Sequence, residues 1–436
     1  MSIRKNSTLL FFVLIIGAFL YVLVNNPTSK KLMLFFIVAN VSVITMTFQK
    51  TIKYSGVFSL INMANAFLLM IFVVRPLQIF LFPEDAIKMH AFKMYSVLSR
   101  YNIDNIPLAQ ASFIGFLGIY ALNIFYKPVM YPKAADSNEI CSNRAMNMHQ
   151  IISLLFICIV ALASEGLYVF KSLILSSSIH IYDLMWVYIF SVVIMYIITI
   201  KKEANIFIYL IILNCIVVLG ISARRQYIVN LLLFFIVPLY YAGKNKDLKK
   251  ILLACILLIF VVIGYGYIRR TRIGYETGGI LFELMDEFCM FDMLSVSLDY
   301  SNSTGIGLFW GYNYLTIFTE MLPFFSILPF DHMFTGIVFN NIYHGAIPTS
   351  LCGSLFFNFS YIGVIIGMTI FSFLLDKIQN SFEKISISSV GYYTIAFSFV
   401  YDVIRVGDIG REFWTMMVSV IVFSFLKRTL PEKQQI

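Results

Sequence analysis

Charged residues are scarce in this sequence. Asp, Glu, Lys and Arg together make up 13% of its 436 residues, whereas hydrophobic residues make up 60% and aromatic residues 17%. The mean hydropathy is +0.84. A water-soluble domain of this length needs a more polar surface, so the scarcity of charge excludes a soluble globular protein and indicates a protein with many membrane spans.

The long apolar runs also lack the alternation of polar and apolar residues that the strands of a membrane β-barrel require. A helix needs about 20 mostly apolar residues to cross about 30 Å of hydrocarbon, and it satisfies its own backbone hydrogen bonds. Windows of that length predict an all-α integral membrane protein with twelve spans, near residues 8–25, 32–49, 55–74, 108–126, 150–170, 181–200, 205–221, 226–242, 251–268, 354–375, 388–404 and 413–426.

The sequence also lacks cysteines at metal-ligand spacing and a signal-peptide cleavage site. The six cysteines show no metal-ligand spacing, and only Cys289 and Cys352 are expected on the outer side, where a disulfide could form. The first span follows Arg4 and Lys5 but has no small-residue cleavage site after it. We therefore expect a retained membrane anchor.

The basic residues fall into two populations. Lys and Arg in short loops favour the cytoplasmic side, which predicts that both termini are cytoplasmic. In that orientation the inner segments carry mostly lysine. The outer segments carry nine arginines, at positions Arg75, Arg100, Arg224, Arg225, Arg269, Arg270, Arg272, Arg405 and Arg411.

Arginines on the outer side run against the preference of Lys and Arg for the cytoplasmic side, so their position needs an explanation. A guanidinium group binds phosphate or carboxylate through two parallel hydrogen bonds, which an ammonium group cannot do. The alternative is that each arginine extends to lipid phosphates at a helix end. Three separate outer turns nevertheless carry such groups, and they predict an anion-binding site formed by Arg224, Arg225, Arg269, Arg270, Arg272, Arg405 and Arg411.

A long outer loop, residues 269–353, divides the nine spans of 1–268 from the three spans of 354–436. Loops of this size between helices are usually functional. The run "LFELMDEFCMFDMLSVSLDY" has an apolar and an acidic face, which predicts a helix lying flat at the membrane interface. The next apolar run is interrupted by Pro323, Pro329 and several glycines, which predicts a re-entrant element.

The end of this loop carries groups suited to a sugar. Asn340, Asn341 and Tyr343 can stack on a ring and hydrogen-bond its hydroxyls. His344 follows them, and a neutral imidazole commonly takes a proton from a hydroxyl. His344 is therefore the predicted catalytic base, with a structural histidine bonded to the backbone as the alternative.

Several of these passages resemble one family. In chain order they are "VVRPLQIF", "GISARRQ", "IRRTR", "GLFWGYNYLTIFTEMLPF", "IPTSLCGSLFFNFSYIGVIIG" and "IRVGDIG". Together they resemble the Wzy-type polymerases of O-antigen or capsule repeat units, over most of the chain from about residue 55 onward. The sequence is also similar, more distantly, to the O-antigen ligases.

The resemblance implies a GT-C-like membrane glycosyltransferase in the bacterial inner membrane that needs neither a metal nor a cofactor. Its substrate would be an undecaprenyl-pyrophosphate-linked oligosaccharide, transferred on the extracytoplasmic face in contact with membrane lipid and, as a further partner, a chain-length regulator. The outer arginines would then stabilise the negative charge on the departing pyrophosphate.

Where many relatives have an acidic residue, this chain has Gly353 and Ser354. His344 is accordingly the first choice for the base, with Glu320, Asp331 and His332 as substitutes. Glu165, a carboxylate within the fifth span, is expected to pair with an arginine or to be buried in a structural pair.

Other classes of function are weighed against the polymerase. A flippase or transporter for the same lipid-linked glycan could use the same arginines, but the sequence lacks the internal repeats common in transporters. A non-catalytic scaffold gives no reason for so many outer arginines. The net charge of +9 is spread over many loops, which argues against nucleic acid as a partner.

Overall fold

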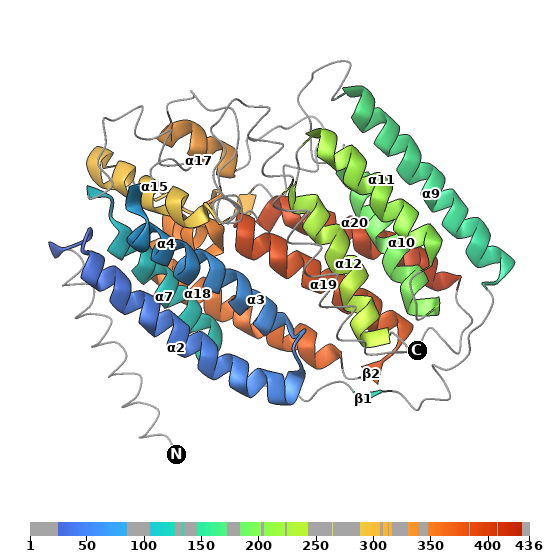
Figure 1. Cartoon of the computed structure of the whole chain (residues 1–436), viewed down its shortest axis with the longest axis horizontal. Helices are drawn as coiled ribbons and strands as arrows, with labels where there is room; N and C mark the ends of the chain where they lie inside the picture. Colours follow the sequence, from blue (N-terminus) through green and yellow to red (C-terminus); the bar gives the residue numbers. More distant parts are fainter. Residues whose placement is uncertain are drawn as a thin grey trace.

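In the computed structural model of the chain, nearly all of the described residues are helical (Figure 1). One pair of two-residue strands, β1 (Lys133–Ala134) and β2 (Lys384–Ile385), is parallel. The structure describes residues 25–84, 105–126, 133–134, 146–171, 184–201, 205–222, 225–242, 264, 288–305, 308–312, 314–315, 330–339, 348–382, 384–407 and 409–429.

Ten of the twelve predicted spans coincide with described helices, and those near 8–25 and 251–268 lie outside the described residues. Five helices in this part of the chain are long and apolar enough to cross a membrane, and four more are shorter and apolar. The protein is an all-α, multi-pass membrane protein. The helices at predicted spans are α2 (Lys30–Ser55), α3 (Leu60–Leu69), α7 (Leu108–Ile124), α9 (Met148–Val169), α10 (Met185–Lys201), α11 (Ile206–Ser222), α12 (Arg225–Ala242), α18 (Ser350–Ser381), α19 (Ile387–Val406) and α20 (Ile409–Arg428).

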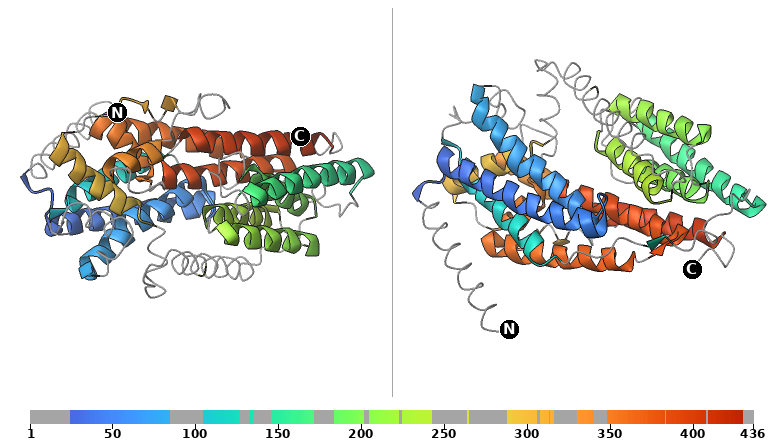
Figure 2. Two further views of the ribbon diagram at one scale, coloured as in Figure 1. Left: turned by 90° about the horizontal axis from the view of Figure 1, so that it is seen from above. Right: turned by 60° about the horizontal axis from the view of Figure 1, so that its bottom comes forward.

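The helices form two packed groups. One core is built from α2, α3, α7, α18 and two helices of the long loop, α15 (Met290–Thr304) and α17 (Phe330–Val338). The other is built from α9, α10, α11 and α20, while α12 and α19 contribute side chains to both. Figure 2 shows the groups side by side. The end of the bundle at which α15 and α17 lie, called here the loop end, is opposite to β1 and β2 (Figure 1).

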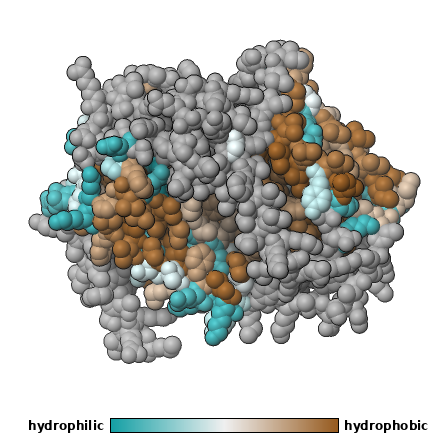
Figure 3. Space-filling view, in the orientation of Figure 1, coloured by the Kyte–Doolittle hydropathy of each residue, from teal (hydrophilic) through white to brown (hydrophobic). Residues whose placement is uncertain are grey.

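Apolar side chains also cover the outside of the bundle. Figure 3 shows one apolar patch over α2–α4 and another over α9 and α11. On α18, Ile362, Ile366, Ile370 and Phe373 are all exposed. Their spacing of three or four residues places them on one helical face, which suits contact with lipid rather than water.

The third predicted span does not end at Val74. A π-helix, η1 (Met70–Val74), follows α3 and continues into α4 (Arg75–Leu81). Proline lacks an N–H and its ring crowds the carbonyl four residues earlier, so Pro76 disturbs the bonding of Phe72. The Phe72 carbonyl instead accepts a hydrogen bond from Asn40 Nδ2 at 3.3 Å. The wider turn preserves the helix past the proline.

The interfacial helix stays a prediction for the residues that define its two faces, whereas the rest of the same run forms a buried helix. Residues 281–287 lie outside the described residues, and α15 begins at Met290. Every residue from Met290 to Leu298 is buried, in a helix packed against α7, α17, α18 and η1. A helix lying flat at an interface would expose one face, so this half of α15 belongs to the protein core.

Candidate functional site

A buried polar cluster joins three helices at the loop end. Asn230 Nδ2 of α12 donates to Asp402 Oδ2 of α19 at 2.6 Å and to the Tyr188 hydroxyl of α10 at 3.2 Å. The Tyr188 hydroxyl donates to Asp402 Oδ2 at 3.4 Å, and Ser398 Oγ donates to Asn230 Oδ1 at 2.8 Å. These side chains are all buried, so their hydrogen bonds fix how α10, α12 and α19 meet.

A second buried carboxylate adjoins this cluster from α20. Glu412 lies in the first turn of α20, and its charge acts on Tyr188 together with that of Asp402. Thr415 Oγ1 donates to the Glu412 carbonyl at 2.8 Å and to Glu412 Oε2 at 3.4 Å. Buried carboxylates are costly unless they are paired or hydrogen-bonded, so two of them in one cluster favour cations nearby.

The turn between α19 and α20 is fixed by Gly407. Its left-handed conformation (φ 73°) ends α19, and its N–H donates to the Val403 carbonyl at 2.9 Å. A Cβ atom here would overlap the Ser350 carbonyl and would lie 3.0 Å from Ser354 Cβ. The turn therefore packs directly on the first residues of α18, where the long loop ends.

The structure brings together the helix ends that carry three of the predicted arginines. Arg225 begins α12, Arg405 lies beside the last residue of α19, and Arg411 is in the first turn of α20. Arg405 is half-buried. For the other two, the structure describes the backbone only. The remaining predicted arginines lie outside the described residues: Arg224, Arg269, Arg270 and Arg272.

The predicted sugar-binding and catalytic residues are not placed by the structure. Asp331 and His332 belong to α17, where only their backbone is described. Gly353 and Ser354 are buried near the start of α18, where Ser354 packs on Gly407 of the α19–α20 turn and Gly353 faces Leu294 of α15. Four predicted site residues and one substitute lie outside the described residues: Asn340, Asn341, Tyr343, His344 and Glu320.

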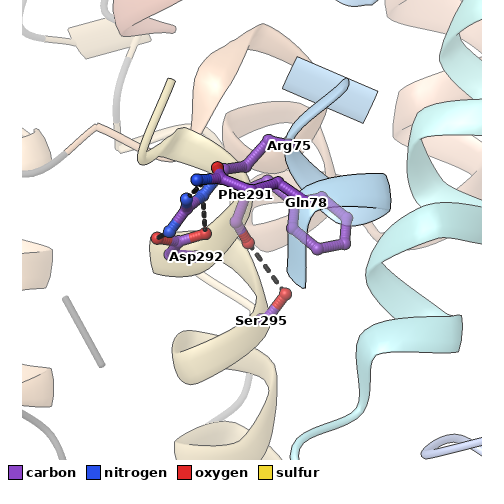
Figure 4. Close-up of polar contacts among 5 residues, drawn as sticks. All are labelled: Arg75, Gln78, Phe291, Asp292 and Ser295. Carbon is purple, nitrogen blue, oxygen red and sulfur yellow. Dashed lines mark hydrogen bonds and ion pairs between the residues drawn. The ribbon is translucent and has the colours of Figure 1, made fainter. Parts of the chain in front are cut away.

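A buried ion pair, not predicted from the sequence, ties the loop to the third span (Figure 4). Arg75 Nε of α4 donates to Asp292 Oδ1 of α15 at 2.8 Å, and Arg75 Nη2 donates to Asp292 Oδ2. Arg75 Nη1 donates to Gln78 Oε1 at 2.6 Å. Both charged side chains are fully buried. The negative partner of Arg75 is thus internal, unlike the anion expected for the outer arginines.

The sequence contains a pattern that is typical of such a pair. Arg75 and Asp292 are each a lone charge in an apolar run, "VVRPLQIF" and "CMFDMLSVSL". Burying either charge alone is prohibitive, so two isolated opposite charges in helices predict a pair. The sequence did not show that these two segments meet.

Among the described residues, the partner of Glu165 is an asparagine rather than an arginine. Asn214 Nδ2 of α11 donates to Glu165 Oε1 at 2.9 Å and to Oε2 at 3.0 Å. The glutamate is thus in a structural pair between α9 and α11, which was the alternative prediction. Cys289 and Cys352 form no disulfide with each other.

Within the described residues, no group of three His, Cys, Asp or Glu side chains could hold a metal ion. No family model, curated protein or solved structure matches the chain.

Proposed function

We propose that this protein is a glycosyltransferase that joins undecaprenyl-pyrophosphate-linked repeat units into a surface polysaccharide, on the outer face of the bacterial inner membrane. The observation that carries the proposal is the 2.6 Å hydrogen bond from Asn230 to Asp402. It places the turn of α12 that begins with Arg225 beside the turn of α19 that carries Arg405. The resemblance to the Wzy-type polymerases, with twelve spans in a GT-C-like shell, supports the same function.

The chemistry of a pyrophosphate leaving group suits this arrangement. When the sugar–pyrophosphate bond breaks, the departing phosphate oxygen takes the electron pair and gains negative charge. Guanidinium groups fixed around that oxygen stabilise the transition state more than the ground state. We assign this role to Arg225, Arg405 and Arg411, completed by Arg224, Arg269, Arg270 and Arg272.

The acceptor sugar needs a base. Its hydroxyl oxygen forms the new bond to the donor sugar, and its proton must pass to a side chain. We assign this step to His344, and sugar binding to Asn340, Asn341 and Tyr343. The contact of Gly407 with Ser350, six residues after His344 in the sequence, supports this assignment because it joins the arginine-bearing turn to the end of the same loop.

The buried carboxylates position the arginine-bearing turns. Asp402 lies one helical turn before Arg405, and Glu412 follows Arg411 directly. Because Asn230, Tyr188 and Thr415 hold these carboxylates by hydrogen bonds, the local negative charge is fixed. It offsets the repulsion among several guanidinium groups when no anion is bound.

The test is polymerisation by the purified protein in lipid nanodiscs, supplied with undecaprenyl-pyrophosphate-linked repeat units. Arg411→Lys keeps the charge but loses the planar fork, and we expect it to slow formation of a glycan ladder by about 100-fold. Arg428→Lys is the matched control at the opposite end of α20 and should leave the ladder unchanged. A ladder from Arg411→Lys and Arg405→Lys equal to that of the wild type would contradict the assignment.

The same preparation separates the other functions. If the wild type makes no ladder but moves lipid-linked glycan across vesicles, the protein is a flippase. If it transfers the glycan only to a lipopolysaccharide core and never to a second repeat unit, it is a ligase. Either result replaces the polymerase.

A further inference from the structure

Helix α18 is broken within its loop-end half. Phe359 and Ser360 leave the helical conformation, and Ser360 has φ 61° and ψ −164°, a region that residues with a side chain rarely adopt. Two oxygen atoms next to the break accept hydrogen bonds from the long loop. The Phe357 carbonyl accepts a hydrogen bond from the Phe309 N–H at 2.9 Å, and Asn358 Oδ1 accepts one from the Gly311 N–H at 3.0 Å.

These two bonds hold a short segment of the long loop, residues 308–312 and 314–315, against the break. Within it, the Tyr312 N–H donates to the Phe309 carbonyl at 3.1 Å, and the Tyr314 N–H donates to the Gly311 carbonyl at 2.9 Å. The Tyr314 ring stacks on Phe359, with centroids 5.7 Å apart. The backbone of this segment is therefore fixed from both sides.

Trp310 occupies the centre of this fixed segment and projects outward. Its backbone lies in the left-handed region (φ 49°), between the two residues that donate to α18. Its side chain is 77% exposed. A large aromatic ring is thus presented to the surroundings on a backbone whose conformation is unfavourable for tryptophan, which indicates a function for the exposed ring.

Polar side chains lie on the other side of the same break. Gln110 Nε2 of α7 donates to the Tyr361 hydroxyl at 2.9 Å, and Asn302 Nδ2 of α15 donates to Gln110 Oε1 at 3.2 Å. Asn302, Ser303 and Thr304 are exposed at the end of α15. Amide and hydroxyl groups therefore flank the segment that carries the indole.

The segment is also close to the arginine-bearing turn between α19 and α20. Gly407 packs on Ser354, whose carbonyl accepts from Asn358 Nδ2 at 2.8 Å, and the other end of that amide binds Gly311. Ser354 and Asn358 are four residues apart, about 6 Å along a helix. One turn of α18 thus separates the two features.

We propose that residues 308–312 and 314–315, with the end of α15, form a carbohydrate subsite. The indole of Trp310 would stack on the apolar face of a sugar ring, and Asn302 and Gln110 would hydrogen-bond its hydroxyls. The inference rests on the proposed function, because it identifies where a sugar of the lipid-linked glycan lies when its pyrophosphate is held at the arginine-bearing turn.

A membrane-interface anchor is the competing use of an exposed tryptophan. Such an anchor needs only exposure to head groups. It does not account for the two hydrogen bonds that fix the backbone on either side of Trp310, or for the exposed amide and hydroxyl groups at the end of α15. These features match a sugar, which has both an apolar face and a polar edge.

The probe is the free oligosaccharide, released from the lipid-linked repeat unit by mild acid and therefore without pyrophosphate. The protein is held in nanodiscs, and binding is measured by calorimetry. We expect Trp310→Ala to weaken binding by about tenfold and Trp310→Phe by less, since phenylalanine retains a stacking face. Equal affinity of the wild type and Trp310→Ala would overturn the proposal.

Fluorescence tests the location of the ring without removing it. Replacing Trp186 and Trp414 by Phe leaves Trp310 as the one tryptophan of the chain. We expect the oligosaccharide to protect its emission from acrylamide. Emission that is quenched by brominated phospholipid in the nanodisc and unaffected by oligosaccharide would make Trp310 a lipid anchor and would also overturn the subsite.

Failure of the subsite and failure of the proposed function are distinguishable. Undecaprenyl pyrophosphate without sugar probes the arginines alone. If Arg405→Lys weakens its binding whereas Trp310→Ala changes nothing with either ligand, the subsite is wrong and the proposed function stands. If oligosaccharide binding depends on Trp310 but no ladder forms, the subsite stands and the polymerase is wrong.

Discussion

Arg75 of α4 and Asp292 of α15 form a fully buried ion pair across 217 residues of sequence (Figure 4). The pair locks the first turn of α15, within the long loop, to the third span immediately after the π-helix. The Phe72 and Phe291 rings, one from each segment, meet edge to face beside it at 6.2 Å. The beginning of α15 is therefore part of the bundle rather than a mobile appendage.

Removing one partner of this pair should lower the stability of the protein strongly, whereas replacing both partners by apolar residues should not. Asp292→Ala leaves the Arg75 guanidinium buried without its carboxylate, and we expect a loss of about 3–5 kcal/mol in the free energy of unfolding. The double variant Arg75→Met, Asp292→Leu removes both charges and should recover most of that loss. Thermal unfolding in one detergent compares the three proteins. If the double variant is as unstable as the single one, the loss of stability does not come from an unpaired buried charge.

The position of most helices follows from the sequence, because an apolar run of about 20 residues has one stable form in a membrane. The ends of the helices do not follow so directly. The third span was predicted to lie near residues 55–74. The structure continues to Leu81, since a π-turn absorbs the proline and Asp292 neutralises the arginine.

The sequence predicted that helix ends meet at the candidate site, but it did not predict the side-chain contacts that join them. The clustering of arginines in three outer turns predicted that helix ends would meet, and Arg225, Arg405 and Arg411 do lie on neighbouring helix ends. Asn230 and Asp402 were missed, because a single polar residue inside a span gives no sign of its partner. Only the packing of α12 against α19 shows that they bind each other.

The turn that carries Arg405 and Arg411 should depend on Gly407. Gly407→Ala places a methyl group against the Ser350 carbonyl in a left-handed conformation. The matched control is Gly305→Ala, which has nearly the same φ (70° against 73°) but open space around the added carbon. We expect the control to lose about 1–2 kcal/mol of stability from the conformation alone, and Gly407→Ala to lose more. Chemical unfolding measures both, and equal losses would show that the packing on Ser350 is unimportant.

Stability and activity should require a neutral hydrogen-bond donor at Asn230, beside Asp402. Asn230→Asp places two carboxylates together in a buried site, so one of them must take up a proton. We expect loss of both stability and ladder formation at about pH 8 and partial recovery at about pH 5.5, because protonation restores a donor between the two groups. Asn214→Asp is the matched control, since it makes the same change beside Glu165, away from the arginine-bearing turns. If both variants lose the ladder equally, the effect comes from general destabilisation.

The break in α18 should tolerate glycine better than any residue with a side chain. Ser360 holds φ 61° and ψ −164°, which glycine adopts without steric cost, and such strain is about 1–3 kcal/mol for other residues. Ser360→Gly should therefore raise the midpoint of thermal unfolding, after the entropy of the more flexible unfolded chain offsets about 0.5–1 kcal/mol of the gain. Ser360→Ala removes the same hydroxyl but keeps the strain, so it should leave the midpoint unchanged or lower it. A lower midpoint for glycine than for alanine would mean that relief of backbone strain at Ser360 does not stabilise this part of α18. The stabilised variant should still bind oligosaccharide, because the hydrogen bonds from Phe309 and Gly311 do not involve the Ser360 side chain.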